Sequence, residues 1–326
     1  MTPSGAPAVA IANLQKRFGG GRTLFGFGPE MPSVHAVQDV DLTIPTGETL
    51  GIVGESGCGK STLARMLVGL IAPSEGSIEI EGRDLGPAAG RDPAAFGRVI
   101  QYIFQDPISS LNPRKTIRQV IEVPLRRLHA MGPEARAARI AEIFDAVNLR
   151  HEFLERYPHE FSGGQAQRIG IARALAAAPR ILVLDEPVSA LDVSVQAQVL
   201  NLLVRLKAEF GLTYLFISHD LAVVEAVSDR VAVMYFGRIV ELARAADIFA
   251  RPRHHYTALL ARSAPVVGRA LTAPEAATAE LPDPLAPPPG CAFAERCPAA
   301  TDRCRKERPE FRDLGNAHFA ACHHPA

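Results

Sequence analysis

A glycine-rich loop between an apolar run and an amphipathic run constrains this chain more than any other feature. Residues 54–61 read Gly-Glu-Ser-Gly-Cys-Gly-Lys-Ser, which fits the pattern G-x-x-x-x-G-K-S/T. The run 50–53 predicts a strand before the loop, and 62–70 predicts a helix after it. This order places loop N–H groups and a helix N-terminus around an anion. The sequence therefore predicts an α/β fold with a nucleotide-phosphate site.

Each residue of this loop has an expected role. Lys60 is expected to reach the β- and γ-phosphates, and the Ser61 hydroxyl to ligate Mg²⁺. We expect Cys58 to contribute its backbone and not its thiol chemistry. The predicted nucleotide-binding residues are Gly54, Glu55, Ser56, Gly57, Cys58, Gly59, Lys60, Ser61 and Thr62.

Two carboxylates follow a second apolar strand. Residues 181–184 read Ile-Leu-Val-Leu, and Asp185 and Glu186 come directly after them. Acids at the carboxyl end of such a strand face the crevice where α/β sheets bind ligands. Asp185 is expected to hold Mg²⁺, and Glu186 to polarise an attacking water. An ordinary solvated acidic pair is the alternative, and the phosphate loop makes it the weaker reading.

A second helix start carries glycines that suit a phosphate. Ser162 can cap a helix at about residue 164, and Gly163 and Gly164 leave its first N–H groups open, with Gln165 following. One nucleotide does not need two such sites in one chain. We therefore expect residues 162–165 to face the nucleotide of a partner subunit.

Composition and patterning divide the chain. Short β-like runs dominate residues 9–106, a helical pattern covers 114–157, and helix and strand signals alternate over 164–240. Hydrophobic residues make up 47%, and 35 basic residues balance 35 acidic ones. The chain should fold, should not bind nucleic acid through a global positive field, and should neither span a membrane nor carry a secretion signal.

Four cysteines gather after a Pro- and Ala-rich stretch. The spacing of Cys291, Cys297, Cys304 and Cys322 lacks the close pairs of structural zinc sites. Widely spaced thiolates can wrap a larger inorganic core such as a [4Fe–4S] cluster. Two alternatives stay open: unligated thiols, or zinc bound with help from a histidine. The candidate histidines are His318, His323 and His324.

Together these motifs resemble the ATP-binding cassette (ABC) ATPases over residues 9–262. The resemblance assigns 54–61 to the Walker A loop, 162–165 to the signature, and Asp185 and Glu186 to Walker B. It further implies roles for four segments. These are Gln105 in the Q-loop, residues 189–192 as the D-loop, His219 as the switch histidine, and Phe18 stacked on adenine. The implied catalytic residues are Glu186, His219 and Gln105. The Gln105 amide is expected to ligand Mg²⁺, alongside Ser61 and Asp185, or to bind the attacking water.

A narrower resemblance links the chain to ATPase subunits of dipeptide, oligopeptide and nickel importers. It rests on Ser-Leu-Asn-Pro-Arg at 110–114, His-Tyr-Thr at 255–257, and the tail motif Pro-Gly-Cys-x-Phe-x-x-Arg-Cys-Pro at 289–298. The implied fold is a P-loop NTPase with a RecA-like core, an N-terminal antiparallel β subdomain, a helical subdomain over about 107–178, and a small cysteine-containing extension. The expected domains are residues 1–262, a linker over 263–290, and the extension over 291–326.

The resemblance implies an ATP-hydrolysing subunit that drives peptide import, with ATP and Mg²⁺ and a [4Fe–4S] cluster as cofactors. Implied partners are a second, non-identical ABC ATPase, two membrane permeases and, indirectly, a substrate-binding protein, at the cytoplasmic face of the inner membrane. One alternative is the same machinery importing nickel or another small solute. Others are a soluble ABC ATPase of DNA repair or translation control, and a purely regulatory nucleotide-binding module. Glu186 and His219 argue against the last.

Overall fold

The computed structural model describes residues 6–20, 32–84, 92–263 and 282–326, and the chain divides into two compact units. Unit 1 comprises Met1–Ala8, Ile44–Thr49 and Ile80–Ile217. Unit 2 comprises Val9–Thr43, Leu50–Glu79 and Ser218–Ala326. Most of the expected linker, residues 264–281, lies outside the described residues.

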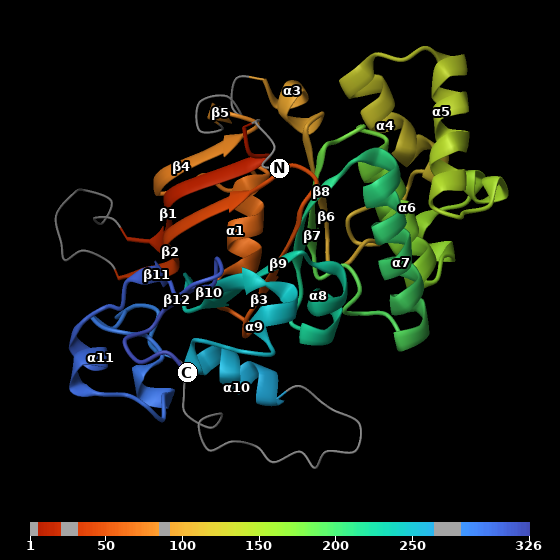
Figure 1. The fold of residues 1–326 in the computed structure, drawn as a ribbon. Helices are drawn as coiled ribbons and strands as arrows, with labels where there is room; N and C mark the ends of the chain where they lie inside the picture. Colours follow the sequence, from red (N-terminus) through yellow and green to blue (C-terminus); the bar gives the residue numbers. More distant parts are fainter. Residues whose placement is uncertain (1–5, 21–31, 85–91, 264–281) are drawn as a thin grey trace. The chain divides into compact units, whose positions relative to one another are not determined.

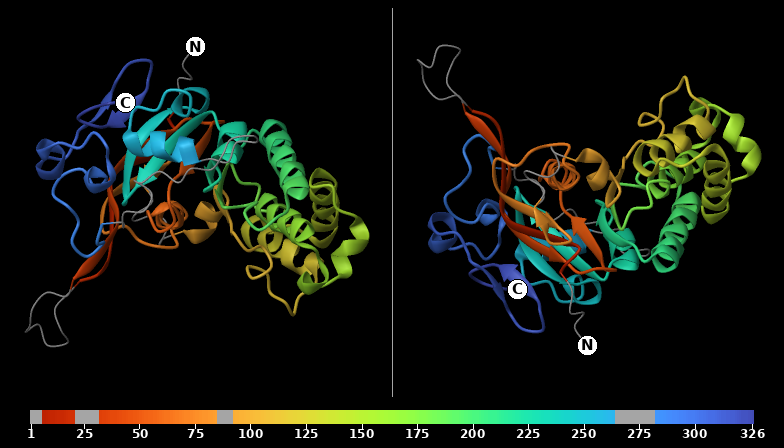
Figure 2. Two further views of the ribbon diagram at one scale, coloured as in Figure 1. Left: turned by 90° about the horizontal axis from the view of Figure 1, so that it is seen from below. Right: turned by 90° about the horizontal axis from the view of Figure 1, so that it is seen from above.

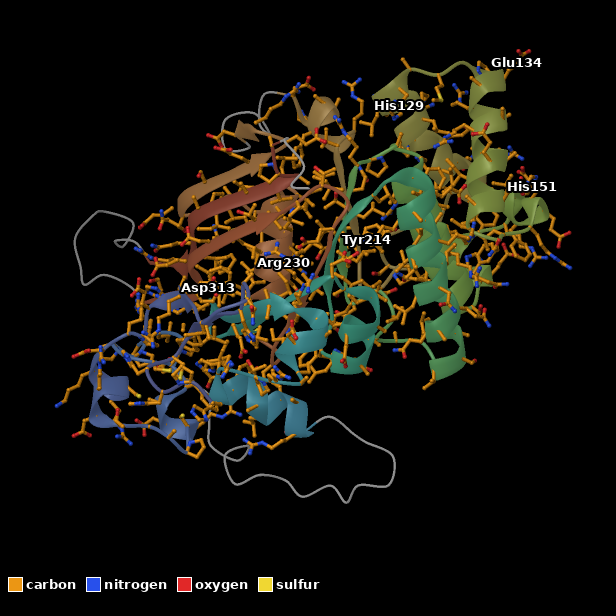
Figure 3. All side chains as sticks on the ribbon, in the orientation of Figure 1. His129, Glu134, His151, Tyr214, Arg230 and Asp313 are labelled. Carbon is orange, nitrogen blue, oxygen red and sulfur yellow. The ribbon has the colours of Figure 1, made fainter. Side chains whose placement is uncertain are left out.

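Three parallel strands form the centre of unit 1. Strand β7 (Ile181–Asp185) pairs with β6 (Ile100–Ile103) and with β8 (Thr213–Ile217), both in parallel. Every residue of β7 and β8 is buried, as in strands covered on both faces. Tyr214, labelled in Figure 3, lies on β8, and its hydroxyl donates to the Leu203 carbonyl at 3.0 Å. The strand signals predicted within residues 164–240 are confirmed by β7 and β8.

Helices make up most of the rest of unit 1, as the helical pattern over 114–157 predicted (Figure 1). Thr116 begins α4 with a capping box: its hydroxyl accepts from the Gln119 N–H, and the Gln119 side chain accepts from the Thr116 N–H. The elements are β5 (Arg83–Asp84), α3 (Pro93–Gly97), α4 (Ile117–His129), α5 (Pro133–Ala146), η1 (His151–Glu155), η2 (Pro158–Glu160), α6 (Gly163–Leu175) and α7 (Val193–Phe210).

Unit 2 begins with an antiparallel β subdomain. Its strands are hydrogen-bonded in the order β2-β1-β4. Alternate residues of β2 from Val40 to Ile44 are buried, so one face of this strand is packed and the other is solvated. The bounds are β1 (Val9–Gly19), β2 (Ser33–Ile44) and β4 (Glu75–Ile80).

A second sheet in unit 2 joins the phosphate-loop strand to the C-terminal segment, the name used here for residues 282–326. Strand β3 pairs in parallel with β9, β9 pairs antiparallel with β10, and β10 and β11 each pair antiparallel with β12. The strands are β3 (Thr49–Val53), β9 (Arg230–Tyr235), β10 (Arg238–Arg244), β11 (Phe311–Asp313) and β12 (Phe319–Ala321).

The helices of unit 2 are short, and the C-terminal segment contains little regular structure. The helices are α1 (Lys60–Leu67), α8 (Leu221–Val227), α9 (Ala245–Ile248), α10 (His255–Ser263), η4 (Ala294–Arg296) and α11 (Asp302–Lys306). In both views of Figure 2 the C-terminal segment lies beside β1 and β2. An ion pair between Arg308 and Asp39, with 3.1 Å between Nη1 and Oδ2, joins the two regions.

Candidate nucleotide-binding site

The phosphate loop runs from the end of β3 to the start of α1, as predicted. Gly59 begins α1 with a φ of 108°, in the left-handed region that favours glycine. A Cβ there would lie 2.2 Å from the Ala36 carbonyl oxygen, and one at Gly54 would lie 2.1 Å from that of Met234. No side chain fits at either position. The loop's close approach to neighbouring backbone therefore requires both glycines.

Lys60 is buried, and its ammonium is held inside the loop. Nζ donates to the Gly54 carbonyl at 2.7 Å and to the Glu55 carbonyl at 2.9 Å. These bonds hold the Lys60 charge against the loop backbone, beside the expected phosphate site. The Cys58 thiol is also buried, and burial raises its pKa.

In unit 1, the structure brings Gln105 close to Glu186, two residues that were predicted on separate grounds. Asp185 ends β7 and is buried, where its carboxylate accepts a hydrogen bond from the Tyr102 hydroxyl. Glu186 follows with a φ of 49°, and its N–H donates to the Ile217 carbonyl at 2.9 Å. The Gln105 amide donates to the Glu186 carboxylate at 3.1 Å. A water held between these groups would meet a base and an orienting amide.

The glycine-containing helix start predicted at residue 162 is present in unit 1. Ser162 is the N-cap of α6, and the Gln165 side chain accepts from the Ser162 N–H at 3.1 Å. Ser162 and Gly163 are exposed. The α6 N-terminus is thus open to an anion from outside the chain. Asp192 of the expected D-loop caps α7 by accepting from the Val195 N–H at 3.0 Å, and this bond lowers the pKa of the Asp192 carboxyl.

Two further predicted residues lie in unit 2 and are exposed. His219 follows β8, next to Ser218, whose hydroxyl accepts from the Asp220 N–H at 3.0 Å. Phe18 lies near the end of β1 with 40% of its surface exposed, and the Lys16 ammonium lies 5.1 Å from its ring centre. An exposed aromatic face is what a stacking role requires. Their roles toward a nucleotide remain predictions.

Comparison with known proteins identifies the family. A family model described as ABC transporter matches residues 37–189, and one described as the C-terminal region of oligopeptide/dipeptide transporters matches residues 240–304. The oligopeptide transport ATP-binding protein AppF of Bacillus subtilis is 47% identical and aligns over 91% of this chain and 92% of its own length. The chain belongs to the ATP-binding subunits of ABC transporters. It is therefore an ATP hydrolase.

Other relatives and solved structures of this ABC family agree. OppF of Haemophilus influenzae, an oligopeptide transport ATP-binding protein, is 46% identical over 92% of this chain and 91% of its own. The dimeric, post-hydrolysis structure of the cassette MJ0796 bound to ADP and Pi has a TM-score of 0.64. It is 30% identical, covering 73% of this chain and 98% of its own. Within the described ranges of the ABC subunit, no helix is long and apolar enough to cross a membrane.

The four C-terminal cysteines of the ABC subunit line one cavity. Cys291, Cys297, Cys304 and Cys322 border it with His323 and His324, whereas His318 does not. All five cysteines lie in described residues as free thiols, and burial raises the pKa of Cys291 to about 11. Across the described residues, no group of three or more Cys, His, Asp or Glu side chains is arranged to hold a metal ion. The structure thus gathers the thiols without supporting a cluster.

Three buried polar residues of the C-terminal part were missed by sequence reasoning. Glu241 on β10 is fully buried and accepts from His318 Nε2 at 2.6 Å, and from the N–H groups of Arg253 and His254. Tyr256 and Arg296 both contact Glu55 of the phosphate loop. A lone glutamate in a strand gives no sequence signal, but Tyr256 and Arg296 lie in the two C-terminal motifs of the importer resemblance.

Proposed function

We propose that this chain is the ATP-hydrolysing subunit of an ABC importer that takes up di- or oligopeptides. The match of residues 240–304 to the C-terminal region of oligopeptide/dipeptide transporters carries the proposal, since a generic cassette does not require that region. The di/tripeptide transport ATP-binding protein DppF of Pseudomonas aeruginosa, 47% identical over 89% of this chain, supports it. Its partners would be two membrane permeases, a second non-identical ABC ATPase and, indirectly, a substrate-binding protein, at the cytoplasmic membrane face.

The proposed chemistry divides between the two units. In unit 2, the loop N–H groups and Lys60 would hold the phosphates, and Ser61 would ligate Mg²⁺. In unit 1, Asp185 would hold Mg²⁺ through water, while Glu186 polarises the attacking water that Gln105 orients. Mg²⁺ held by these residues would supply positive charge that neutralises the phosphates. His219 would hydrogen-bond the γ-phosphate, and residues 162–165 would complete the partner ATPase's site.

Glu186→Gln tests the catalytic assignment in the assembled transporter. It keeps the side chain's shape but removes the carboxylate, so hydrolysis should slow by about 10²-fold or more while ATP binding persists. Glu225→Gln is the matched control, because Glu225 is exposed on α8. Near-normal turnover in the Glu186 variant would contradict the assignment. Vesicles that contain the assembled transporter and take up peptide but not nickel would support the peptide function over the nickel alternative.

We further propose that the four C-terminal cysteines bind a [4Fe–4S] cluster. The proposal rests on the four cysteines bordering one cavity and on thiolates being the ligands that such clusters use, and a bound cluster would add a structural crosslink. Anaerobically purified protein should then contain about four irons and four sulfides per chain. Stoichiometric zinc without sulfide would favour the zinc alternative. Metal-free protein with an equally protease-resistant C-terminal segment would leave only unligated thiols.

Cys297→Ser provides a second test of the cluster that does not depend on hydrolysis. Losing one of four ligands should lower iron content and increase proteolysis of the C-terminal segment. Cys58→Ser is the matched control, since Cys58 lies in the phosphate loop and does not border the cysteine cavity. Equal iron content in the Cys297 variant would contradict its role as a ligand.

A further inference from the structure

The C-terminal motif Cys-x-Phe-x-x-Arg-Cys contains two residues, Phe293 and Arg296, that have no role in the proposed ATP chemistry. Phe293 and Arg296 are three residues apart around the η4 turn, so they project from the same face of a 3₁₀ helix. Phe293 is buried, with its ring centre 5.4 Å from that of Tyr235 and 5.5 Å from that of Tyr256. This aromatic cluster fixes the turn beneath the Arg296 side chain.

The Arg296 guanidinium extends from this cluster to the phosphate loop. Its Nη1 and Nη2 each donate to a different carboxylate oxygen of Glu55, both at 2.9 Å. Only 5% of the Arg296 side chain is exposed, and the Tyr235 and Phe293 rings lie within 6 Å of its central carbon. Because the two charge-assisted hydrogen bonds are parallel, they fix the orientation of the Glu55 carboxylate relative to the Arg296 guanidinium as well as the distance between them.

Glu55 is held at each of its polar groups. Its carboxylate binds Arg296, its N–H donates to the Tyr256 hydroxyl at 2.8 Å, and its carbonyl accepts from Lys60 Nζ at 2.9 Å. Tyr256 is fully buried. The second residue of the phosphate loop is therefore fixed from the C-terminal part of the same unit. An unpaired Glu55 carboxylate would also place a negative charge where phosphates must bind.

We propose that Arg296 is a positioning residue for ATP binding, which holds the phosphate loop in its binding shape through Glu55. The proposal rests on the proposed role of residues 54–61 as the ATP-phosphate site. It assigns the C-terminal segment a direct part in nucleotide affinity. Arg296 contacts no nucleotide in this role and acts through the carboxylate it pairs with.

Arg296→Ala in the full chain, assembled with its partners, tests the proposal. We expect the Kd for Mg-ATP and the KM for hydrolysis to rise about tenfold or more, with kcat changed less than about twofold, because the loop is disordered but the hydrolytic groups are intact. Arg296→Lys should recover only part of the affinity, since an ammonium cannot pair with both oxygens. Arg308→Ala, which breaks a different ion pair of the C-terminal segment, is the control and should leave both constants unchanged.

Glu55→Gln removes the same ion pair by changing the phosphate loop and not the C-terminal segment. It therefore tests the inference even if an Arg296 variant loosens the C-terminal segment. It should raise Kd and KM in the same way. Combining it with Arg296→Ala should add little, since the two changes remove one interaction. Unchanged affinity in both single variants would overturn the inference. Lys60→Ala distinguishes failure of the Arg296 inference from failure of the phosphate-site assignment. If Lys60→Ala also left ATP binding intact, the assignment of residues 54–61 as the phosphate site would be wrong.

Discussion

Replacing Glu241 by Gln should selectively loosen the C-terminal segment. The buried carboxylate accepts hydrogen bonds from His318 Nε2 and from the N–H groups of Arg253 and His254, at 2.6, 2.6 and 2.8 Å. A glutamine has one acceptor oxygen, and its NH₂ group would face one of these donors. Hydrogen bonds to charged groups contribute about 1.5–3 kcal/mol each, so losing one or two should cost about 1.5–6 kcal/mol.

Hydrogen exchange measures this loss where it occurs. Glu241 lies opposite Ala320 in the β10–β12 pairing, so amides in peptides covering 238–244 and 319–321 report its opening. A cost of about 1.5–6 kcal/mol corresponds to exchange roughly 10- to 20,000-fold faster. Amides of β7 should keep their wild-type rates, as should all amides in the exposed-site control Glu225→Gln. Exchange within threefold of wild type in β10 and β12 would refute the reasoning.

Three further outcomes follow from the site and from the buried polar groups. Lys60→Ala should weaken ATP binding itself, which a nucleotide titration measures, because the buried cation of the loop is lost. Ser162→Arg should slow hydrolysis at the site that α6 completes on the partner ATPase, while this chain still binds ATP; full activity of isolated monomers would contradict it. Burial lowers the pKa of His254 to about 3, so the His254 imidazole binds a proton more tightly in the unfolded chain than in the folded one. Stability should fall as pH drops from about 6.5 toward 3, and His254→Gln should flatten this part of the pH profile in thermal melts.

Local patterns in the sequence predicted the parts of the site that are contiguous in the chain. The phosphate loop, the acidic end of β7 and the capped start of α6 each combine a short motif with a strand or helix signal, and all three have the predicted local structure. Glu186 is predicted from its place after a buried strand, and Gln105 from the family resemblance. The hydrogen bond between them could not be predicted from the sequence, because it depends on how β6 and β7 pair.

The features that sequence reasoning missed depend on contacts between distant residues. Glu55 and Arg296 are 241 positions apart, and Glu241 and His318 are 77 apart. Helix α3 was missed for another reason: with five residues it is too short to show an amphipathic period, and an Asp92 cap begins it. Buried charges look like solvated ones in a sequence, because only the fold determines which partner neutralises them.

The pairing of β12 with β10 has a consequence for any shortened form of this protein. Residues 239–243 of β10 are all buried, and β12 hydrogen-bonds along the side that does not face β9. Without residues 311–321, β10 would become a sheet edge with unpaired backbone groups and a sequence that is apolar apart from Glu241 and the two terminal arginines. Such edges recruit strands from other molecules. We therefore expect the C-terminal segment to protect this protein against aggregation, and its removal to yield insoluble material even if every nucleotide-binding residue were kept.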